Sequence, residues 1–466
     1  MSWGQMKRSK IAVSALRRAD RSSSFLLKSL LWLGLVCLAF SFYNWPIQTF
    51  FNLFSIIAGL NVLVATLRLF AIFQIKPSRP KLAKLTEFPK YSVLVPILNE
   101  ANMVPRLMNR LERLDYPADK LEILLICEEI DAATIRAVRM NLRPPFRLII
   151  TPKGTPQTKP RALNYALPHS DGEIITVYDA EDKPHPEQLK TALAAFNQNP
   201  DWAGLQAPLN YYNSEINWLT RQFSLEYAAL FHVWVPFLAK LGAPFPLGGT
   251  SNHIRRSALE SCGGWDAHNV TEDADLSFRL SARGSKIGFI DCPTEEEAVC
   301  NLQDWNKQRS RWMKGFMQTW LVHMHRPFRP MNFYGLIRFF TLQLTLGYTL
   351  LCATLFCLSV IAGCLYVSMH YFTGFTLPFS VLHFIAFSLS LAVAIMLGII
   401  GVVRAGKPHL AIFAPLMPIY WMLLFWPVVK AFIEIWRRPF HWHKTPHGIC
   451  LPPKKPEHSF ANAPAE

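Results

Sequence analysis

The chain has 466 residues, of which 51% are hydrophobic and 13% aromatic, and its 48 Lys and Arg outnumber 32 Asp and Glu, giving a net charge of +16. The length allows more than one domain. The positive charge does not call for a nucleic-acid partner, because Lys and Arg gather beside long apolar runs, an arrangement that suits an anionic membrane surface.

Two apolar runs, Phe25 to Trp45 and Phe50 to Leu67, follow a basic arm over residues 1–24. Each approaches the ~20 residues that span a bilayer core, so we predict two transmembrane helices within residues 25–75. A cleaved signal peptide is the alternative, because the arm supplies a positive leader. No small-residue cleavage site follows the first run, and a second run comes at once, which favours membrane helices.

Residues 80–330 have the pattern of a separate folded domain. Apolar runs predict buried strands, and amphipathic stretches between or after them predict helices. The strands are "YSVLVPI" (91–97), "LEILLIC" (121–127), "FRLIIT" (146–151) and "EIITVYD" (173–179), and the helices are "ANMVPRLMNRLERL" (101–114) and "PEQLKTALAAF" (186–196). This alternation predicts an α/β fold with a mostly parallel sheet and helices on both faces, in which ligands bind at the carboxyl ends of the strands.

Acidic side chains follow two of the predicted strands. Asp179, Glu181 and Asp182 come after the fourth strand, and Glu128 and Glu129 come after the second. Such a cluster is either a cation site or a solvated turn, and Asp182 in particular is either a ligand or a turn residue. This motif alone does not decide between them.

Two further motifs lie downstream. "TEDADL" (271–276) predicts a helix N-terminus with Thr271 as its cap. In "QRSRW", Gln308, Arg311 and Trp312 stand at spacing i, i+3, i+4 and therefore share one helix face. Each motif has a purely structural explanation, but three of them in this order between membrane segments are hard to explain in that way.

Apolar runs return after residue 331, and we predict an interfacial helix and about three membrane segments over 331–438. The runs are 346–369, 381–403 and 410–436. "MNFYGLIRFFTLQL" (331–344) is predicted to lie in the interface with Arg338 snorkelling, or to form part of a further crossing. Three prolines in the last run predict a broken or re-entrant helix instead of a simple span.

The basic segments give a topology that the span count does not match. Lys and Arg are dense in the arm, in "KPSRPKLAK" (76–84) and in the tail over 439–466, so all three are expected in the cytoplasm. Two spans before the central domain and three after it would place the tail outside, so the number of spans stays open. The nine cysteines form no CxxC pair, and we expect reduced, buried thiols and no zinc site.

Taken together, the motifs resemble membrane-embedded family 2 glycosyltransferases, the group that contains cellulose, hyaluronan and chitin synthases. The resemblance runs in detail from about Tyr91 to Trp320. It rests on the acidic pair after the second strand, "TKPRALN", "YDAED", "LGGTSNHIRR", "TEDADL" and a complete QxxRW. It implies a GT-A, Rossmann-like cytosolic domain flanked by transmembrane helices, a nucleotide-diphosphate sugar donor, Mg²⁺ or Mn²⁺, and inverting transfer that forms a β-linkage.

The residue types suit that chemistry on the donor side. Asp179 and Glu181 have DxD-like spacing and could hold a hard cation against the diphosphate. Arg311 offers a forked contact to phosphate, for which Lys159 is a second cation. The remaining donor-binding candidates are Gln308 and the acidic group Glu128, Glu129 and Asp131, of which the member that meets the nucleobase is undecided.

On the acceptor side, inversion requires a base opposite the leaving group, and Asp273 fits that role by analogy with inverting glycosidases. Trp312 offers a flat face to an acceptor sugar. Glu272 is expected to orient the loop at the acceptor, and Asp275 to face the helix surface.

Three functions follow, in order of preference. The first is a polysaccharide synthase that moves sugar from UDP-glucose or UDP-N-acetylglucosamine to a growing glycan. The alternative is a non-processive transferase that adds one or a few sugars to a membrane lipid. The least favoured is a non-enzymatic transporter, for which an internal repeat would be expected. The expected partners are the donor, a glycan or glycolipid acceptor, the lipid bilayer and envelope export proteins, and the expected location is the bacterial inner membrane, as a multi-pass protein.

Overall fold

The structure is a computed structural model that describes residues 25–74, 82, 85–325, 332–374, 381–441, 448 and 450. The basic arm over 1–24, most of the segment 76–84 and most of the tail over 439–466 lie outside the described residues. The predictions made for those segments stay predictions.

A seven-stranded sheet of order β3-β2-β1-β4-β8-β6-β9 forms the centre of the α/β body. Its strands are β1 (Tyr91–Ile97), β2 (Leu121–Glu128), β3 (Phe146–Thr151), β4 (Ile174–Val177), β6 (Trp202–Gln206), β8 (Asn252–Arg255) and β9 (Lys286–Phe289). Within this sheet β8 runs antiparallel to β4 and β6, and the other neighbours run parallel. The four predicted strands and the mostly parallel α/β sheet are confirmed.

Helices cover both faces of the sheet because side chains alternate along its strands. On β1, Tyr91, Val93 and Val95 belong to the core that includes α4 and α7, whereas Leu94 belongs to the core on the other face with α6 and α11. The helices are α4 (Val104–Leu111), α5 (Ala132–Asn141), α6 (Lys159–Ala166), α7 (Gln188–Gln198), α8 (Trp218–Ala229), α9 (Val235–Lys240), α10 (Arg256–Ser261) and α11 (Glu272–Ser281), with short turns η3 (Ala118–Lys120), η4 (Leu167–His169) and η5 (Leu230–Trp234).

A small second sheet lies beside the main one and carries part of the site. Its strands are β5 (Lys183–Pro184), β10 (Thr294–Glu296) and β7 (Leu209–Tyr211), in the order β5-β10-β7. It links the loop after β4 to the segment that leads into α12 (Leu302–Met324).

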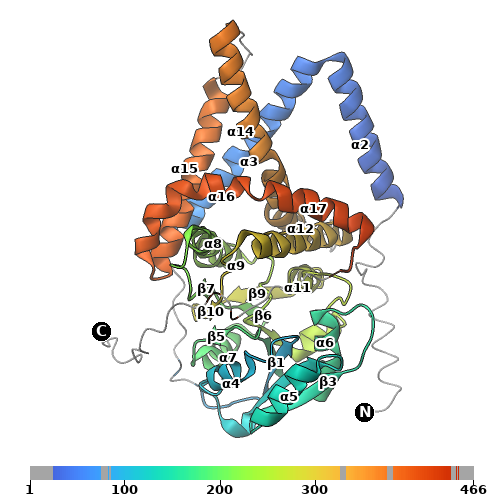
Figure 1. The fold of residues 1–466 in the computed structure, drawn as a ribbon, viewed down its shortest axis with the longest axis vertical. Coiled ribbons are helices and arrows are strands. Elements are labelled where there is room, and N and C mark those ends of the chain that lie inside the picture. Colours follow the sequence, from blue (N-terminus) through green and yellow to red (C-terminus); the bar gives the residue numbers. More distant parts are fainter. Residues whose placement is uncertain are drawn as a thin grey trace.

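Long apolar helices rise from one side of the α/β body (Figure 1). They are α2 (Phe25–Asn44), α3 (Pro46–Phe73), α14 (Tyr348–Thr373) and α15 (Val381–Arg404). Among the described residues, four segments are long and apolar enough to cross a membrane: Phe51–Phe73, Phe333–Thr373, Leu382–Arg404 and Pro408–Arg437.

The last of these segments differs from the others in shape and direction. It is divided into η7 (Pro408–Leu416), α16 (Met417–Met422) and α17 (Phe425–Arg437). In Figure 1, α16 and α17 lie across the bases of α3 and α14 instead of running alongside them. Lys314 on α12 forms an ion pair with Glu434 on α17 at 3.0 Å, so α17 is fastened to the α/β body.

The predicted interfacial segment forms α13 (Phe333–Leu342), which continues through η6 (Gln343–Gly347) into α14. The expectation that Arg338 snorkels is wrong. Arg338 is 1% exposed, and its guanidinium lies 3.3 Å from the His323 ring on α12. The α/β body covers this part of the helix, so the cation is buried in protein instead of reaching the interface.

The expectation of reduced thiols fails for two cysteines, because Cys300 and Cys450 form a disulfide. They lie 150 residues apart in sequence, and the fold brings their Cα atoms to 6.0 Å. Glu297 accepts hydrogen bonds from the amides of Gly448 and Cys450, which holds this part of the tail against the α/β body. Spacing between cysteines in the sequence does not reveal such a pairing.

Candidate active site

A cavity of about 540 Å³ extends from the carboxyl end of β4 to the space between α3, α14 and α15. Its wall includes the predicted residues Glu128, Lys159, Asp179, Glu181, Glu272, Asp273, Gln308, Arg311 and Trp312. Glu129 and Asp131 do not line it. Motifs far apart in the sequence therefore meet around one space.

Lys159 and Asp179 form an ion pair at the base of the cavity. Lys159 is the first residue of α6 and Asp179 follows β4, so adjacent elements present opposite charges. The Lys159 ammonium also donates to the Gly249 carbonyl at 2.7 Å. Burial lowers the pKa of Lys159, but Asp179 and Glu272 outweigh burial and raise it, so the side chain is a firmly charged cation.

Gly249 is the point at which the charged groups converge. A methyl group in place of its hydrogen would lie 3.5 Å from Oδ2 of Asp273, 3.8 Å from Nζ of Lys159 and 3.9 Å from Oδ2 of Asp179. The two carboxylates and the ammonium thus surround one small space. A side chain at this position would occupy the space that a ligand needs to reach them.

Asp182 is a turn residue. It is fully buried, and its Oδ2 accepts hydrogen bonds from the Asp179 amide at 2.7 Å and from the Thr250 hydroxyl. Burial and the neighbouring Asp179 raise its pKa to about 7. Arg110 donates to the carbonyls of Glu181 and Asp182, so a buried guanidinium fixes the loop that presents Asp179 and Glu181.

Two more carboxyl groups, those of Glu181 and Glu296, border the same space, where burial and neighbouring carboxylates disfavour their charged forms. Burial, and then Asp179 and Asp182, raise the pKa of Glu181 and Glu296 well above the ordinary value. A cation would relieve this repulsion. Glu296, at the end of β10, was not predicted, because a run of three glutamates does not indicate which members face a cavity.

The described residues contain no group of three or more His, Cys, Asp and Glu side chains arranged to hold a metal ion. Mg²⁺ commonly uses one or two carboxylates of a protein and completes its coordination with substrate phosphates and water. Asp179 and Glu181 would be those carboxylates, and a cation there would bring a diphosphate to the Lys159 side of the cavity.

The helix α11 places Glu272 and Asp273 at its first turn, beside α12. The predicted helix start is confirmed and Thr271 stands at the N-cap position, but its side chain makes no capping hydrogen bond. Its hydroxyl and methyl instead pack against Gly315 of α12, where any Cβ would collide with them. Burial and Asp273 raise the pKa of Glu272 to about 7, and burial raises the pKa of Asp273.

Asp275 does not face the helix surface as predicted. It is 1% exposed, forms an ion pair with Arg279 at 2.6 Å and lies 3.1 Å from the His323 ring. Burial acts to raise its pKa, but Arg279 and His323 lower it below the ordinary value. Within this motif, Asp273 thus lines the cavity, whereas Asp275 holds α11 to α12.

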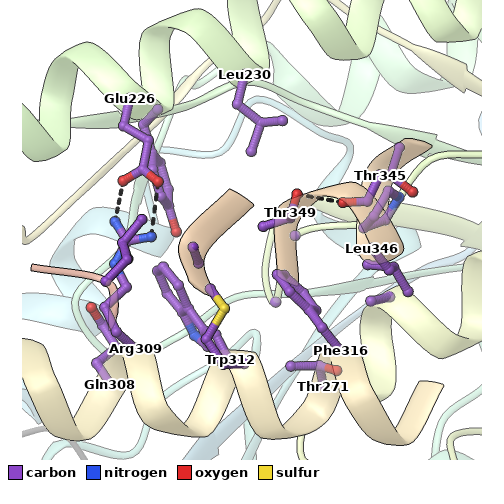
Figure 2. A pocket seen from close by; sticks show the side chains of 18 of the residues that line it. Glu226, Leu230, Thr271, Gln308, Arg309, Trp312, Phe316, Thr345, Leu346 and Thr349 are labelled. Carbon is purple, nitrogen blue, oxygen red and sulfur yellow. Dashed lines mark hydrogen bonds and ion pairs between the residues drawn. The ribbon is translucent and has the colours of Figure 1, made fainter. Parts of the chain in front are cut away.

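The face of α12 that carries QxxRW points into the cavity, as Figure 2 shows for Gln308, Trp312 and Phe316. The Trp312 ring stacks against Tyr227 of α8, with ring centroids 6.0 Å apart and planes 29° apart. Gln308 is 8% exposed, and its Oε1 has no hydrogen-bond partner among the described residues. An unsatisfied buried acceptor is costly, so this oxygen is suited to a donor group of a ligand.

Arg309, which the sequence did not single out, positions Trp312. Its guanidinium lies 4.7 Å from the Trp312 ring centroid and forms an ion pair with Glu226 (Figure 2). The Tyr420 hydroxyl of α16 donates to the same carboxylate at 2.8 Å. A basic residue inside QxxRW was the available signal, but its partners come from elements 83 and 111 residues away.

Arg311 faces the carboxylates of the cavity. Burial lowers its pKa, and Glu272, Asp179 and Asp273 act in the opposite direction. With Lys159 it gives the cavity two cations near the metal-binding candidates. This is the charge pattern expected for a bound diphosphate.

The acidic group after β2 divides into three different environments. Glu128 lines the cavity and pairs with Arg161 at 2.6 Å. Glu129 is exposed and accepts from the Lys153 amide at 3.0 Å. Asp131 caps α5 through the Thr134 amide and also accepts from the Asn99 amide. Glu128 is the member of this group that a ligand in the cavity could reach.

The chain is similar in sequence to glycosyltransferases. A family model described as glycosyl transferase family group 2 matches residues 174–429. The β-monoglucosyldiacylglycerol synthase of Synechocystis sp. is 29% identical over 245 residues, which are 51% of this chain and 50% of that protein. The probable glycosyltransferase YdaM of Bacillus subtilis is 28% identical over 242 residues, 50% of this chain and 56% of that protein. The chain spans about half the length of the curated relatives it matches.

Among solved structures, the mannosyltransferase PcManGT from Pyrobaculum calidifontis, in complex with GDP-Man and Mn²⁺, is similar with a TM-score of 0.53 at 18% identity. The match covers 82% of this chain and 96% of that chain. At this identity the likeness shows the fold, and it confirms the expected α/β architecture of the GT-A type.

Proposed function

The chain belongs to glycosyl transferase family group 2, and on that premise we propose that it transfers a sugar from a nucleotide-diphosphate donor to a hydroxyl group of a membrane lipid. The transfer inverts the anomeric carbon and forms a β-linkage. UDP-glucose is the preferred donor and UDP-N-acetylglucosamine the second. The choice of a glucose donor is supported by the β-monoglucosyldiacylglycerol synthases among the relatives, whose names specify a glucosyl group.

The observation that carries the lipid acceptor is the continuity of the cavity. The same space that borders Asp179 and Asp273 is lined further up by Phe54 of α3, Phe356 of α14 and Leu391 of α15. Apolar walls between membrane helices suit acyl chains, and the carboxylates below suit a polar head that carries the acceptor hydroxyl. A polysaccharide synthase is the second candidate, because the complete QxxRW face lines the cavity.

On the donor side, the proposal assigns the diphosphate to Lys159 and Arg311, and the metal to Asp179 and Glu181. Mg²⁺ or Mn²⁺, when bound, would neutralise charge on the diphosphate and stabilise it as a leaving group. The Gln308 amide and Glu128 remain for contacts to the rest of the donor. The structurally similar mannosyltransferase PcManGT is complexed with Mn²⁺, which is consistent with this assignment.

On the acceptor side, Asp273 takes the proton of the acceptor hydroxyl as its oxygen attacks the anomeric carbon. The bond between that carbon and the diphosphate oxygen breaks, and the nucleoside diphosphate leaves. Glu272 orients the first turn of α11. Trp312, held by Arg309 and Tyr227, supports the acceptor head.

For the membrane arrangement, the proposal is that α2, α3, α14 and α15 cross the bilayer and that α16 and α17 lie at its surface. Four crossings put the basic arm and the basic tail on the same side, which removes the mismatch in the sequence-based topology. The α/β domain over 80–330 then lies in the cytoplasm, at the inner membrane of a bacterium.

A product analysis tests the acceptor class. Purified protein in liposomes, supplied with radiolabelled UDP-glucose and Mn²⁺, is expected to yield a labelled product that is soluble in organic solvent and migrates on thin layers as a glycolipid. Liposomes without protein, and protein with the Asp273→Asn substitution, serve as controls. A labelled product of high molecular mass that stays in the aqueous phase would instead establish the polysaccharide synthase.

A second experiment tests the role of Trp312. We expect Trp312→Ala to reduce transfer about five- to tenfold while UDP affinity stays near that of the wild type, because stacking on a ring contributes roughly 1 to 1.5 kcal/mol. Trp312→Phe should recover much of the transfer, since a flat face remains. A matched fall in UDP affinity and transfer for both variants would assign Trp312 to the donor or to packing.

A further inference from the structure

A cation that lines the cavity, Arg68, has no part in the mechanism above. Arg68 lies on α3 and lines the cavity together with Asn61, two turns away on the same helix, and Tyr348 of α14. The Tyr348 hydroxyl donates to Asn61 at 2.8 Å, and the Arg68 guanidinium lies 5.8 Å from the Tyr348 ring centroid. The three side chains form a polar patch, here called the Arg68 patch, on the wall between α3 and α14.

A simpler explanation is that Arg68 snorkels toward the membrane surface, as cations near the end of a span commonly do. Its position argues against this. The side chain is half-buried, borders the cavity and lies near the Tyr348 ring. Among the described residues, no carboxylate forms an ion pair with it. A cation without an anionic partner in a membrane cavity points to a ligand that supplies the negative charge.

The order of chemistry along the cavity indicates what that ligand is. Phe54 stands 14 positions before Arg68 on α3, roughly 21 Å at ~1.5 Å per residue. Phe54 therefore lies above the patch. So do Phe356, which is eight positions beyond Tyr348 on α14, and Phe387, whose ring centroid lies 6.3 Å from that of Phe356, whereas Asp273 belongs to the α/β body below. From the membrane end of the cavity to the domain end, the wall is first apolar, then carries the Arg68 cation, and finally carries the Asp273 carboxylate, the proposed catalytic base.

We infer that the Arg68 patch binds the phosphate of the acceptor lipid, so that the acceptor is a phosphate-bearing lipid whose head hydroxyl lies beyond the phosphate. The acyl chains occupy the space between α3, α14 and α15, and the phosphate pairs with Arg68. The hydroxyl then reaches Asp273. A guanidinium suits this role because it forms forked, charge-assisted hydrogen bonds to phosphate oxygens. This inference rests on the proposed lipid acceptor and adds the class of its head group.

Equilibrium binding to detergent-solubilised protein tests the patch without any turnover. Labelled phosphatidylglycerol carries chains, a phosphate and head hydroxyls, diacylglycerol lacks the phosphate, and glycerol 1-phosphate lacks the chains. We expect the wild type to bind phosphatidylglycerol at least tenfold more tightly than either comparison compound. Arg68→Gln should lose at least tenfold of that affinity and leave diacylglycerol and UDP binding unchanged, whereas Arg68→Lys should lose less.

The control is Lys430→Gln, which removes a cation from α17 outside the cavity and should change no affinity. Equal binding of phosphatidylglycerol and diacylglycerol, or an Arg68→Gln protein with wild-type lipid affinity, overturns the inference. A fall in UDP affinity for Arg68→Gln also overturns it, since Arg68 would then serve the donor. If lipid binding depends on Arg68 but the product analysis yields an aqueous polymer, the Arg68 patch is supported as a phosphate site. The proposed lipid acceptor is then contradicted.

Discussion

Asp273→Asn is expected to transfer sugar ~10² to 10⁴ times more slowly than the wild type, the range that a positioned general base contributes. The amide keeps the shape of the side chain and its place beside Gly249 but cannot accept the hydroxyl proton. Donor affinity and thermal stability should stay close to wild type. Initial rates, UDP affinity by calorimetry and unfolding temperature are measured on the same preparation.

The pH profile gives this prediction a second readout. Burial raises the pKa of Asp273, so the carboxyl group is protonated at low pH and the rate should rise with pH as it loses its proton. That limb should be absent in Asp273→Asn. Asp201→Asn, which changes an exposed carboxylate paired with Lys286, is the matched control and should leave rate and profile unchanged. Near-normal transfer by Asp273→Asn would remove Asp273 as the base.

Asp275→Asn is unsuitable as that control. Its partners Arg279 and His323 would lose a buried charge, and breaking a buried pair typically costs ~3–5 kcal/mol of folding stability. Slow transfer by this variant would report loss of the fold.

Asp179→Asn is expected to lower sugar transfer about 10²-fold or more, the scale seen when an electrostatic contact to developing charge is removed. The physical reason is that a diphosphate would meet the remaining carboxylates without a firmly bound cation. Binding of UDP in the presence of Mn²⁺ should weaken in parallel, because the metal and the diphosphate hold each other. Asp179→Glu, which keeps the charge, should retain more of both.

Chelation separates the metal from the side chain. Excess EDTA should abolish transfer by the wild type, and added Mn²⁺ should restore it. The affinity of the wild type for UDP should fall in EDTA to that of Asp179→Asn, whose affinity should no longer respond to Mn²⁺. Full turnover in EDTA would contradict the metal assignment and leave the Lys159–Asp179 ion pair as a structural contact.

The structure separates roles that the motifs had grouped together. In the loop after β4, Asp182 is the same residue type as Asp179 and lies three positions away, yet it is buried and holds the loop by accepting from the Asp179 amide. In "TEDADL", Asp273 faces the cavity and Asp275 faces the protein interior. Position within a motif does not state which side chain faces the ligand, because that depends on what packs against the other side.

Periodic and local features of this protein could be predicted from the amino-acid sequence. The strands over 91–97, 121–127 and 146–151 were predictable because apolar runs of strand length are bounded by polar turns. The apolar runs of membrane length were predictable because hydrocarbon thickness sets a minimum length of helix. The face shared by Gln308, Arg311 and Trp312 followed from the helical repeat.

Contacts between residues far apart in the sequence, by contrast, could be identified only from the tertiary structure. The disulfide joins Cys300 and Cys450, which are 150 residues apart. Arg309, which positions Trp312, pairs with Glu226 at a separation of 83 residues, and the Arg68 patch includes a hydrogen bond between Tyr348 and Asn61 at a separation of 287 residues. Such pairings leave no trace in local periodicity, since the free energy that fixes them comes from burial and charge compensation in the assembled fold. A hydrophobic repeat records which side of an element is buried, whereas the partner on that side is chosen by the packing of the whole chain.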